Sequence, residues 1–574
     1  MASFRLPAFF RNIGAACSAL AHRVEAKVLL LQIFLGVVVI TLGSTWYHTL
    51  TDYQTEHARI SAEIEELKAS EEELPPKLPA IALGIGSIIA DAAFLNALLI
   101  RRRHSAALKR RLTQTSLWIA AIGVLIAWLP TDFALSRSAL FGQGFIGEAP
   151  SQIAYAGKLV LIAFFVLSFP IAAHLHYRSS LLDRYVIQSF ITPFSFCLIG
   201  FVAIWLIADL TDNGPNLVGA DAGTVLRFYV IQLPFMILFV MPVTLLLSLL
   251  YSLSRMSKSN EIISMLGAGR SMMRMLRPIF AFGIYASLIC LVFKYQWAPL
   301  SAGYKEALLE EINQENADKR RGEKRKLDNP WSKIGHYYKN EVDNRSWWIS
   351  RVPYDMMRRP LNGVMLMQFD ANGKPVMSFR ANSAKWFHGT GDWRFSGGKT
   401  YLYDEDGIPH VQSWNFLTIP EWRETPWKVL STAQNPEFMG IPGLTTYLNS
   451  NADLTPQTLA PFRTNWWYCW AEPMSCLVMV LVAAPLGIVY SRRGVLGGVA
   501  SSIIIFALMY FCSGSFVAAG QAGKMPPFLA AWITNFLFGG VGAVLLWSRA
   551  RNRDLPKPKA ILARLLGLRR AAAR

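Results

Sequence analysis

Long apolar runs alternate with short charged segments along most of this chain. A helix needs about 20 apolar residues to cross roughly 30 Å of hydrocarbon. Runs of that kind occur near 28–46, 79–100, 116–134, 157–176, 188–209, 223–250, 278–298, 470–490, 496–519 and 527–547. The pattern predicts an α-helical polytopic membrane protein with about ten transmembrane helices. The charged segment 52–73 predicts a short helix outside the membrane.

The segment 301–465 breaks this pattern with short runs rich in β-branched and aromatic residues. Turn-forming residues at 370–374 (DANGK) and 389–392 (GTGD) separate some of these runs. We expect strands at 346–350, 363–369, 375–381, 385–389 and 400–404, preceded by a helix over 305–326 that extends the span before it. Regular short strands predict a sandwich, a jelly roll or a related open sheet.

The positions of the basic residues along the chain indicate its membrane topology. The net charge is +19 and 53% of the residues are hydrophobic, but the basic residues cluster at the ends of apolar runs, so nucleic-acid binding is not indicated. The clusters are Arg101–Arg103 with Lys109–Arg111, Arg178 with Arg184, Arg492 with Arg493, and the tail 549–574. These basic clusters all lie on the same side of the membrane if every apolar run crosses the membrane once. Both termini are then cytoplasmic, and 301–465 is extracytoplasmic.

No catalytic, metal or cofactor motif is evident. The GGKT sequence at 397–400 lacks the glycine spacing of a phosphate loop and is interpreted as a turn. His174 and His176 have no accompanying metal-binding pattern. None of the six cysteines lies in 301–465, so no disulfide framework supports that segment. We expect a protein that is not an enzyme.

The segment Tyr251–Arg277 is an amphipathic basic stretch between two apolar runs. A helix lying flat at the cytoplasmic face could rest on anionic lipid or could dock a soluble partner. Glu261 is the single acid among the basic residues of this stretch. Lipid binding alone does not favour an acid there, so Glu261 favours partner recognition.

Ionisable residues also stand at the expected outer ends of several spans: Asp209, Asp212, Arg227, Lys294 and Glu472. Charges at the edge of hydrocarbon are costly and usually face an interior or a partner. They can be structural ion pairs, such as Lys294 with Glu472 or Arg227 with Asp221 or Asp212, or they can contact a ligand.

From residue 181 onward the chain resembles the LptF/LptG permease family, the membrane subunits of the lipopolysaccharide export ABC transporter. The resemblance rests on LLDRYVIQSFITPF (181–194), on the run 233–279, on WAEPMSCLVMVLVAAPLGI (470–488) and on GKMPPFLAAWITNFLF (523–538). It covers roughly two thirds of the chain. The family layout is three spans, an extracytoplasmic jellyroll-like β domain and three further spans. It implies permease spans in 181–300 and 466–548 around a periplasmic β domain at 301–465.

The resemblance implies a permease subunit that extracts lipopolysaccharide from the bacterial inner membrane. Its partners would be a cytoplasmic ABC ATPase dimer, a second LptF/LptG-type permease and a periplasmic β-jellyroll bridge protein. The matching coupling segment, 255–270, assigns ATPase coupling to Ser257, Asn260, Glu261, Leu266 and Gly269. We expect acyl chains to contact one dry face of the β domain, because side chains alternate between faces along 363–369.

Two features depart from the family pattern. Residues 1–180 form an extra four-span region of unknown function, and no basic residue lies between Tyr185 and Asp209 in the first family span. Arg227 and Lys294 are therefore the tentative contacts to an anionic lipid headgroup. An ion-coupled secondary transporter and a non-transporting scaffold that presents the β domain are the alternatives. A neighbouring ATPase gene and a second permease gene would favour export over both.

Overall fold

The computed structural model contains ten helices that are long and apolar enough to cross a membrane in the part of the chain that it describes. That part comprises residues 24–67, 77–100, 106–141, 151–217, 221–305, 308–309, 312, 331–340, 343–353, 360–370, 374–387, 392–404, 408–419, 422, 424, 426–429, 435–452, 454–488 and 495–551. The chain divides into two compact units, Met1–Gly142 with Leu159–Ser179 and Gln143–Lys158 with Ser180–Arg574. Most of the basic tail lies outside the described residues.

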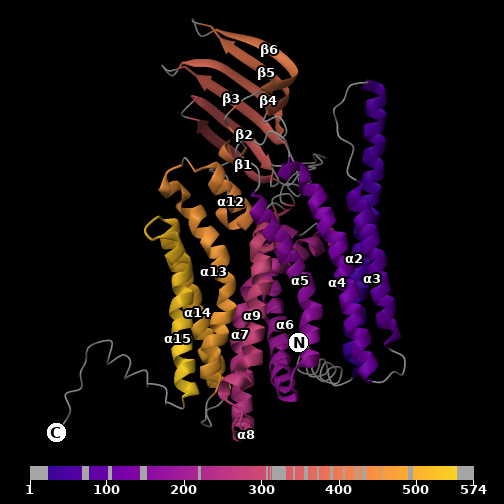
Figure 1. Cartoon of the computed structure of the whole chain (residues 1–574). Coiled ribbons are helices and arrows are strands. Elements are labelled where there is room, and N and C mark those ends of the chain that lie inside the picture. Colours follow the sequence, from indigo (N-terminus) through magenta and orange to yellow (C-terminus); the bar gives the residue numbers. More distant parts are fainter. Residues whose placement is uncertain are drawn as a thin grey trace, which may run out of the picture. The chain divides into compact units, whose positions relative to one another are not determined.

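The first unit is built from four long helices (Figure 1). They are α2 (Val24–Leu67), α3 (Leu78–Leu99), α4 (Ala106–Phe141) and most of α5 (Gln152–Arg178). Small residues let α3 and α4 approach closely, since a Cβ added to Gly86 would lie 2.5 Å from the Cβ of Ala127. The Asn96 amide donates to Ser116 Oγ at 3.0 Å across the same pair.

The charged segment after the first span is helical, but it is not a separate helix. It continues α2 to Leu67, which makes α2 44 residues long. No proline or glycine occurs between Ser44 and Leu67 to end the helix. Residues 52–67 of the predicted segment are therefore helical, as part of a longer helix and not as a short one, and 68–73 lie outside the described residues.

The second unit contains six long helices, which run side by side in Figure 1. They are α6 (Leu181–Leu217), α7 (Ala222–Lys258), α9 (Met272–Val292), α13 (Pro456–Gly487), α14 (Val495–Gln521) and α15 (Pro527–Ala550). A seven-residue helix, α8 (Glu261–Gly267), connects α7 to α9. α9 continues through a π-helical turn, η1 (Phe293–Trp297), and helical residues follow to Lys305 and at 308, 309 and 312. The rest of the helix expected over 305–326 lies outside the described residues. Three further short helical elements are described in this unit: α11 (Pro426–Val429), η2 (Pro436–Phe438) and α12 (Ile441–Ser450).

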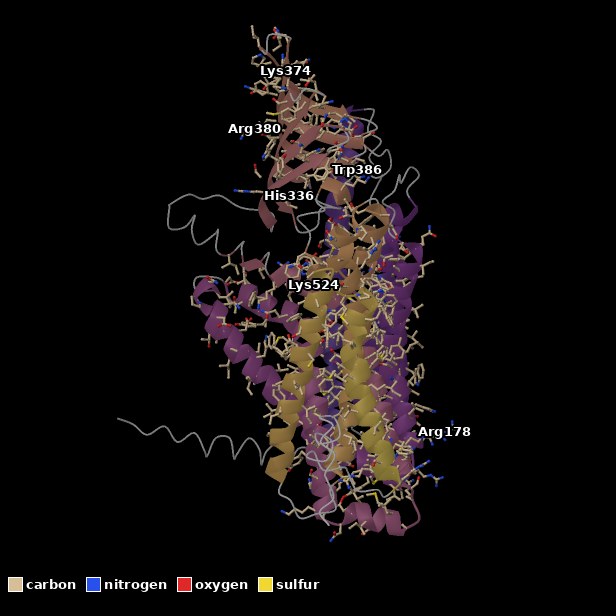
Figure 2. The ribbon with its side chains drawn as sticks, turned by 90° about the vertical axis from the view of Figure 1, so that its left-hand side faces the viewer. Arg178, His336, Lys374, Arg380, Trp386 and Lys524 are labelled. Atoms are coloured by element: carbon tan, nitrogen blue, oxygen red, sulfur yellow. The ribbon has the colours of Figure 1, made fainter. Side chains whose placement is uncertain are left out.

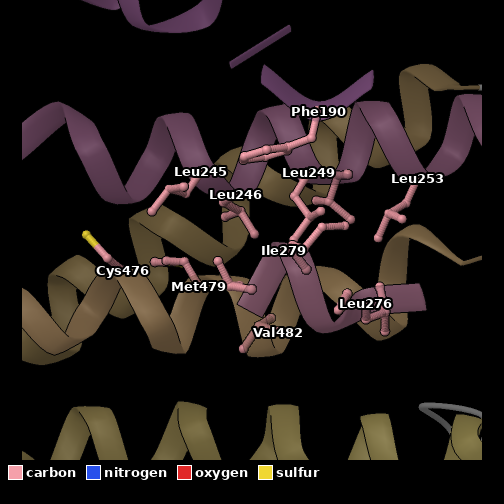
Figure 3. Close-up of a cluster of buried hydrophobic side chains, with 14 of the residues drawn as sticks. Phe190, Leu245, Leu246, Leu249, Leu253, Leu276, Ile279, Cys476, Met479 and Val482 are labelled. Atoms are coloured by element: carbon pink, nitrogen blue, oxygen red, sulfur yellow. The ribbon is translucent and has the colours of Figure 1, made fainter. Parts of the chain in front are cut away.

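The core of these helices is aliphatic and closely packed (Figure 3). Leu245 and Leu249 of α7 lie among Ile279 of α9 and Met479 of α13, all almost fully buried. Gly542 lets α15 approach the α13 backbone, since a Cβ there would lie 2.9 Å from the carbonyl carbon of Leu481. In an apolar 18-residue stretch of each helix, 61% of the residues are buried in α7 and in α13, against 11% in α6 and in α14. α7 and α13 are therefore the central helices.

Six strands form one antiparallel sheet in sequential order, β1 to β6. They are β1 (Trp331–Asn340), β2 (Arg345–Pro353), β3 (Leu361–Phe369), β4 (Pro375–Phe387), β5 (Asp392–Tyr403) and β6 (Pro409–Ile419). The sheet confirms a β region apart from the helices. The run expected at 375–381 and the described part of the run at 385–389 belong to the single strand β4. The two edge strands, β1 and β6, were not predicted.

The GGKT sequence lies inside β5, so its interpretation as a turn was wrong. Gly397 has φ +59°, and a Cβ on Gly398 would lie 2.4 Å from the Trp414 ring of β6. The two glycines therefore serve a bend in the strand and a close approach of an aromatic ring. In the sequence, two adjacent glycines are also typical of a turn, which is why this site was interpreted as one.

One face of the sheet is dry and aromatic. Val364 and Leu366 of β3 are buried beside Trp347 and Phe379, whereas Met365 between them is 40% exposed. This alternation confirms the expected dry face of β3. On β4, Arg380 is exposed next to the buried Phe379, and Figure 2 shows its side chain projecting from the sheet.

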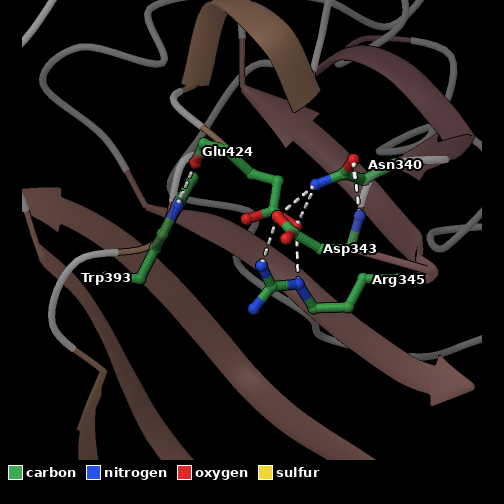
Figure 4. Close-up of polar contacts among 5 residues, drawn as sticks. All are labelled: Asn340, Asp343, Arg345, Trp393 and Glu424. Carbon is green, nitrogen blue, oxygen red and sulfur yellow. Dashed lines mark hydrogen bonds and ion pairs between the residues drawn. The ribbon is translucent and has the colours of Figure 1, made fainter. Parts of the chain in front are cut away.

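The chain after β6 packs against the dry face. Trp422 and Val429 join the aromatic cluster, and the carboxylate of Glu424, 1% exposed, pairs with Arg345 Nε at 2.7 Å. Asn340 donates to the same carboxylate at 2.9 Å, and Trp393 donates to the Glu424 carbonyl at 2.6 Å (Figure 4). A buried charge that is paired and hydrogen-bonded in this way fixes the segment on the sheet.

Candidate functional site

The coupling segment lies at the end of the permease helices where α7 stops and α9 starts. Ser257 lies in the last turn of α7, Asn260 precedes α8, Glu261 and Leu266 are in α8, and Gly269 follows it. The structure therefore brings the five expected coupling residues together within one helix–turn–helix. We call this end the coupling end and the opposite end of the helices the far end.

Two unusual backbone conformations shape this segment. Asn260 has φ 59° and Gly269 has φ +81°, which are left-handed conformations that asparagine and glycine adopt most readily. At the end of α8, the amide of Gly269 donates to Leu266 O at 3.0 Å and that of Arg270 to Met265 O at 3.3 Å. This pair of bonds is a Schellman motif, which ends a helix at a glycine. α8 is therefore a defined short helix.

α8 has a buried side and an exposed side. Ile262 and Met265 are buried in the helix core at 1% and 7% exposure, and Leu266 packs against the same core. Ile263 is 50% exposed and Met273, at the start of α9, is 47% exposed. The segment thus offers apolar side chains to a surface outside this chain.

Glu261 is hydrogen-bonded to two neutral hydroxyl groups. Tyr185 of α6 donates to Oε2 at 2.8 Å, and Ser259 donates to Oε1 at 2.8 Å. Both partners orient the carboxylate without neutralising it. Its negative charge is consequently still available to a cation from a partner.

The far end carries two ion pairs that the helices enclose. Lys294 Nζ of η1 lies 2.6 Å from Glu472 Oε2 of α13, and these side chains are 12% and 24% exposed. Lys305 Nζ lies 2.6 Å from Asp209 Oδ1 of α6, with 25% and 6% exposed. Lys294 also lies 5.2 Å from the centre of the Tyr468 ring. The Lys294–Glu472 pair was one of the two arrangements that the sequence left open.

Arg227 differs from these lysines because it is exposed on the first turns of α7. No described acidic residue forms an ion pair with it, and Asp221, one expected partner, instead caps α7 by accepting from the Gly223 amide at 3.0 Å. Lys524, on the connection between α14 and α15, is exposed too (Figure 2). Arg227 and Lys524 are therefore two exposed cations at the far end that can meet an anion directly.

A cavity of about 50 Å³ opens beside Glu472, between α7, α13, α14 and α15. Polar side chains of Tyr468, Ser475, Ser513 and Asn535 line it together with apolar ones. The volume holds a few water molecules. In the described part of the chain, no three histidine, cysteine or acidic side chains are grouped as metal ligands.

Several residues of these sites were not found from the sequence. Lys305 and its partner Asp209 lie 96 residues apart, and Tyr185 and Glu261 lie 76 apart. Nothing in the sequence distinguishes Asp183, Tyr185 and Arg270 from other polar residues at the ends of spans. Lys524 did carry a signal, because it lies within the GKMPPFLAAWITNFLF run that marks the resemblance.

The model of the lipopolysaccharide export system permease family, LptF/LptG, matches residues 184–548. This match spans more than half of the chain. The chain belongs to the LptF/LptG family. No curated protein matches it.

Membership of the LptF/LptG family identifies the chain as a permease, that is, a transporter membrane component. The matched region begins near the start of α6 and ends near the end of α15, so it contains the coupling segment, the β sheet and both ion pairs. Helices α2 to α5 precede the matched region. The extra N-terminal spans expected from the sequence are thus present as helices.

Proposed function

We propose that the chain is the membrane subunit of an ATP-driven lipopolysaccharide exporter of the bacterial inner membrane, with both termini in the cytoplasm. Extracting several acyl chains from a bilayer costs about 0.8 kcal/mol per buried CH₂ group, so an external energy source is needed. The GGKT sequence lies in a β-strand and cannot cradle a nucleotide. A cytoplasmic ABC ATPase dimer therefore supplies the energy.

The coupling segment is the single observation that carries this proposal. It is a rigid short helix with buried anchors, an oriented carboxylate at Glu261 and an exposed apolar side chain at Ile263. A helix that only rested on lipid would need neither the acid nor the defined ends. The ATPase docks here, and Ser257, Asn260, Glu261, Leu266 and Gly269 form or shape the contact.

The second permease and the lipid would meet the outer helices. Only 11% of the residues in the apolar 18-residue stretch of α6, and likewise of α14, are buried within this chain. The remaining surface of these helices suits acyl chains or another permease. Arg227 and Lys294 are the proposed contacts to the anionic headgroup. To bind a phosphate, Lys294 would have to leave its ion pair with Glu472. Arg227 forms no ion pair with a described acidic residue and could bind the phosphate directly.

The β sheet would pass the lipid to a periplasmic bridge protein of similar β architecture. β6 is an edge strand that pairs only with β5, and its side chains are largely exposed, including Phe416 at 82%. An exposed edge of this kind can accept a strand from another sheet. The aromatic face would provide the dry surface for acyl chains.

The ion-coupled alternative has less support. It would need broken helices around its site, yet α7 is continuous from Ala222 to Lys258 through Pro234 and Pro242. A scaffold that only presents the β domain would not need the coupling segment. Purification from solubilised membranes, with mass spectrometry of bound proteins and lipid, separates the three functions.

Glu261→Lys tests the coupling contact itself. Reversing this charge places like charges together, and truncating a partner of a buried charge pair costs about 2–5 kcal/mol. We expect the variant to insert into the membrane but to lose ATPase co-purification. Glu261→Gln is the matched control, because it can still accept from Tyr185 while it removes the charge, and it should weaken the complex less. A normal yield of active complex with Glu261→Lys would contradict the proposal.

A further inference from the structure

Both ends of α8 are bonded to the first turns of α6, a helix that is not adjacent to α8 in the sequence. Glu261, the first residue of α8, accepts from Tyr185 at 2.8 Å. Arg270, which follows the Schellman turn of α8, lies 2.8 Å from Asp183. α8 therefore has three helices attached to it: α7 and α9 through the chain, and α6 through side chains.

The contact at Arg270 is built from three residues. Its Nη1 donates to Asp183 Oδ1 at 2.8 Å and its Nη2 donates to Ser180 Oγ at 3.0 Å. Ser180 in turn donates to Asp183 Oδ2 at 2.7 Å. A guanidinium that uses two nitrogens has a fixed orientation, so this contact restrains direction as well as distance.

The fully buried residues of α6 lie toward its two ends. Its buried residues are Val186, Phe190, Phe194, Asp209 and Leu217. The first three pack in the helix core at the coupling end, and Ser252 of α7 donates to the Ser189 carbonyl at 3.1 Å there. The stretch between Phe194 and Asp209 has no buried residue. Leu198 nevertheless packs against the helix core, and the Trp205 ring lies 5.2 Å from the Phe239 ring of α7, so the middle of α6 contacts α7 and would move together with it.

We propose that the first turns of α6 belong to the coupling element, with Asp183, Tyr185 and Arg270 as positioning residues. When the ATPase displaces α8, the two polar contacts move α6 together with α7 and α9. The inference rests on the proposed function and adds the residues that transmit the motion to α6. Tyr185 acts through Glu261, and Asp183 acts through Arg270.

The competing account is that these contacts only stabilise the helix bundle. The two accounts differ in what they predict for the ratio of lipid extracted to ATP hydrolysed. A stabilising contact affects the amount of intact complex, whereas a transmitting contact affects the lipid extracted by each intact complex. The ratio measured on purified complex is therefore the deciding quantity.

The experiment uses the full chain in its complex, reconstituted in liposomes that contain lipopolysaccharide. Asp183→Arg and Arg270→Asp each place like charges together, and the double variant restores opposite charges. Coupling free energies between sites correspond to factors of about 5 to 150. We expect each single variant to keep the ATPase and to hydrolyse ATP while lipid extracted per ATP falls about five-fold or more. The double variant should recover most of that loss.

Tyr185→Phe provides a second route if the charge reversals fail to assemble. It removes one hydroxyl and keeps the ring, so the complex should form and the ratio should fall in the same direction. Arg274→Ala, an exposed cation near the same segment, should leave the ratio unchanged.

An unchanged ratio in Tyr185→Phe and in both charge reversals, with an intact complex, overturns this inference alone. Single reversals that lower the ratio without recovery in the double variant also overturn it. An unmodified chain that captures no ATPase overturns the proposed function, and the inference falls with it.

Discussion

The two ends of the permease helices use charge differently. At the far end, Lys294 and Lys305 are enclosed with Glu472 and Asp209, and Asp209 is only 6% exposed. At the coupling end, Arg270 and Asp183 are 19% and 29% exposed, and Glu261 accepts hydrogen bonds from the neutral hydroxyls of Tyr185 and Ser259. Pairs that the helices enclose hold those helices together, whereas charges left uncompensated can respond to a partner. The same residue types therefore have different roles at the two ends.

The largest effect should come from unpairing a far-end charge. Glu472→Leu leaves Lys294, which is 12% exposed, without its counter-ion. Losing one partner of a fully buried pair costs about 3–5 kcal/mol, and the cost here should lie below that because Glu472 is 24% exposed. The thermal unfolding midpoint of the purified complex should fall clearly. In Lys294→Met combined with Glu472→Leu, most of the loss should be recovered, because no unpaired charge is left. Equal midpoints for the single variant and the unmodified chain would break the comparison.

Exposed far-end cations should affect lipid instead of stability. Arg227→Ala and Lys524→Ala each remove a cation that can bond to phosphate, and charge-assisted hydrogen bonds contribute about 1.5–3 kcal/mol. Bound lipopolysaccharide should fall roughly ten-fold or more for each, with the unfolding midpoint unchanged. Lys294→Ala should lower the midpoint, and it should also lower bound lipid if Lys294 exchanges Glu472 for phosphate. A lower midpoint with unchanged lipid in Arg227→Ala would make that residue structural.

The smallest effect on stability should occur at the coupling end. The Arg270–Asp183 pair is partly exposed, and such pairs contribute about 1 kcal/mol or less. Arg270→Ala should therefore shift the unfolding midpoint only slightly, although it removes a contact between α6 and the coupling segment. A shift as large as that of Glu472→Leu would show that both ends hold their helices in the same way.

The strands show where sequence patterns succeed. β2 and β3 were predicted because SWWIS (346–350) and GVMLMQF (363–369) are short runs of large apolar residues, and the turn signal DANGK follows the second. β6 (PHVQSWNFLTI) was missed although it contains β-branched and aromatic residues, and most of its side chains are exposed. β4 was divided because Asn382 and Ser383 resemble a break, although Ser383 Oγ lies 2.5 Å from Ser396 Oγ of β5 inside the ladder.

The candidate sites show the same limit. The coupling residues were found because they lie close together in the sequence and carry a recognisable motif. Tyr185 was missed as a site residue because its contact with Glu261 joins two helices that the sequence separates. Lys294 was named from its place at the end of a span, but its pairing with Glu472 needed the position of α13, and its contact with a headgroup stays a prediction.

The sequence by itself determined the ten spans, the β segment and the position of the coupling helix, because hydropathy, length and glycine placement are local properties. Only the tertiary structure decided that Lys294 faces Glu472, that Lys305 reaches Asp209 and that α6 is bonded to both ends of α8. These contacts depend on which faces of distant helices pack together. That packing is selected by the fit of side chains such as Leu249 and Ile279 in the shared core, and no single helix encodes it.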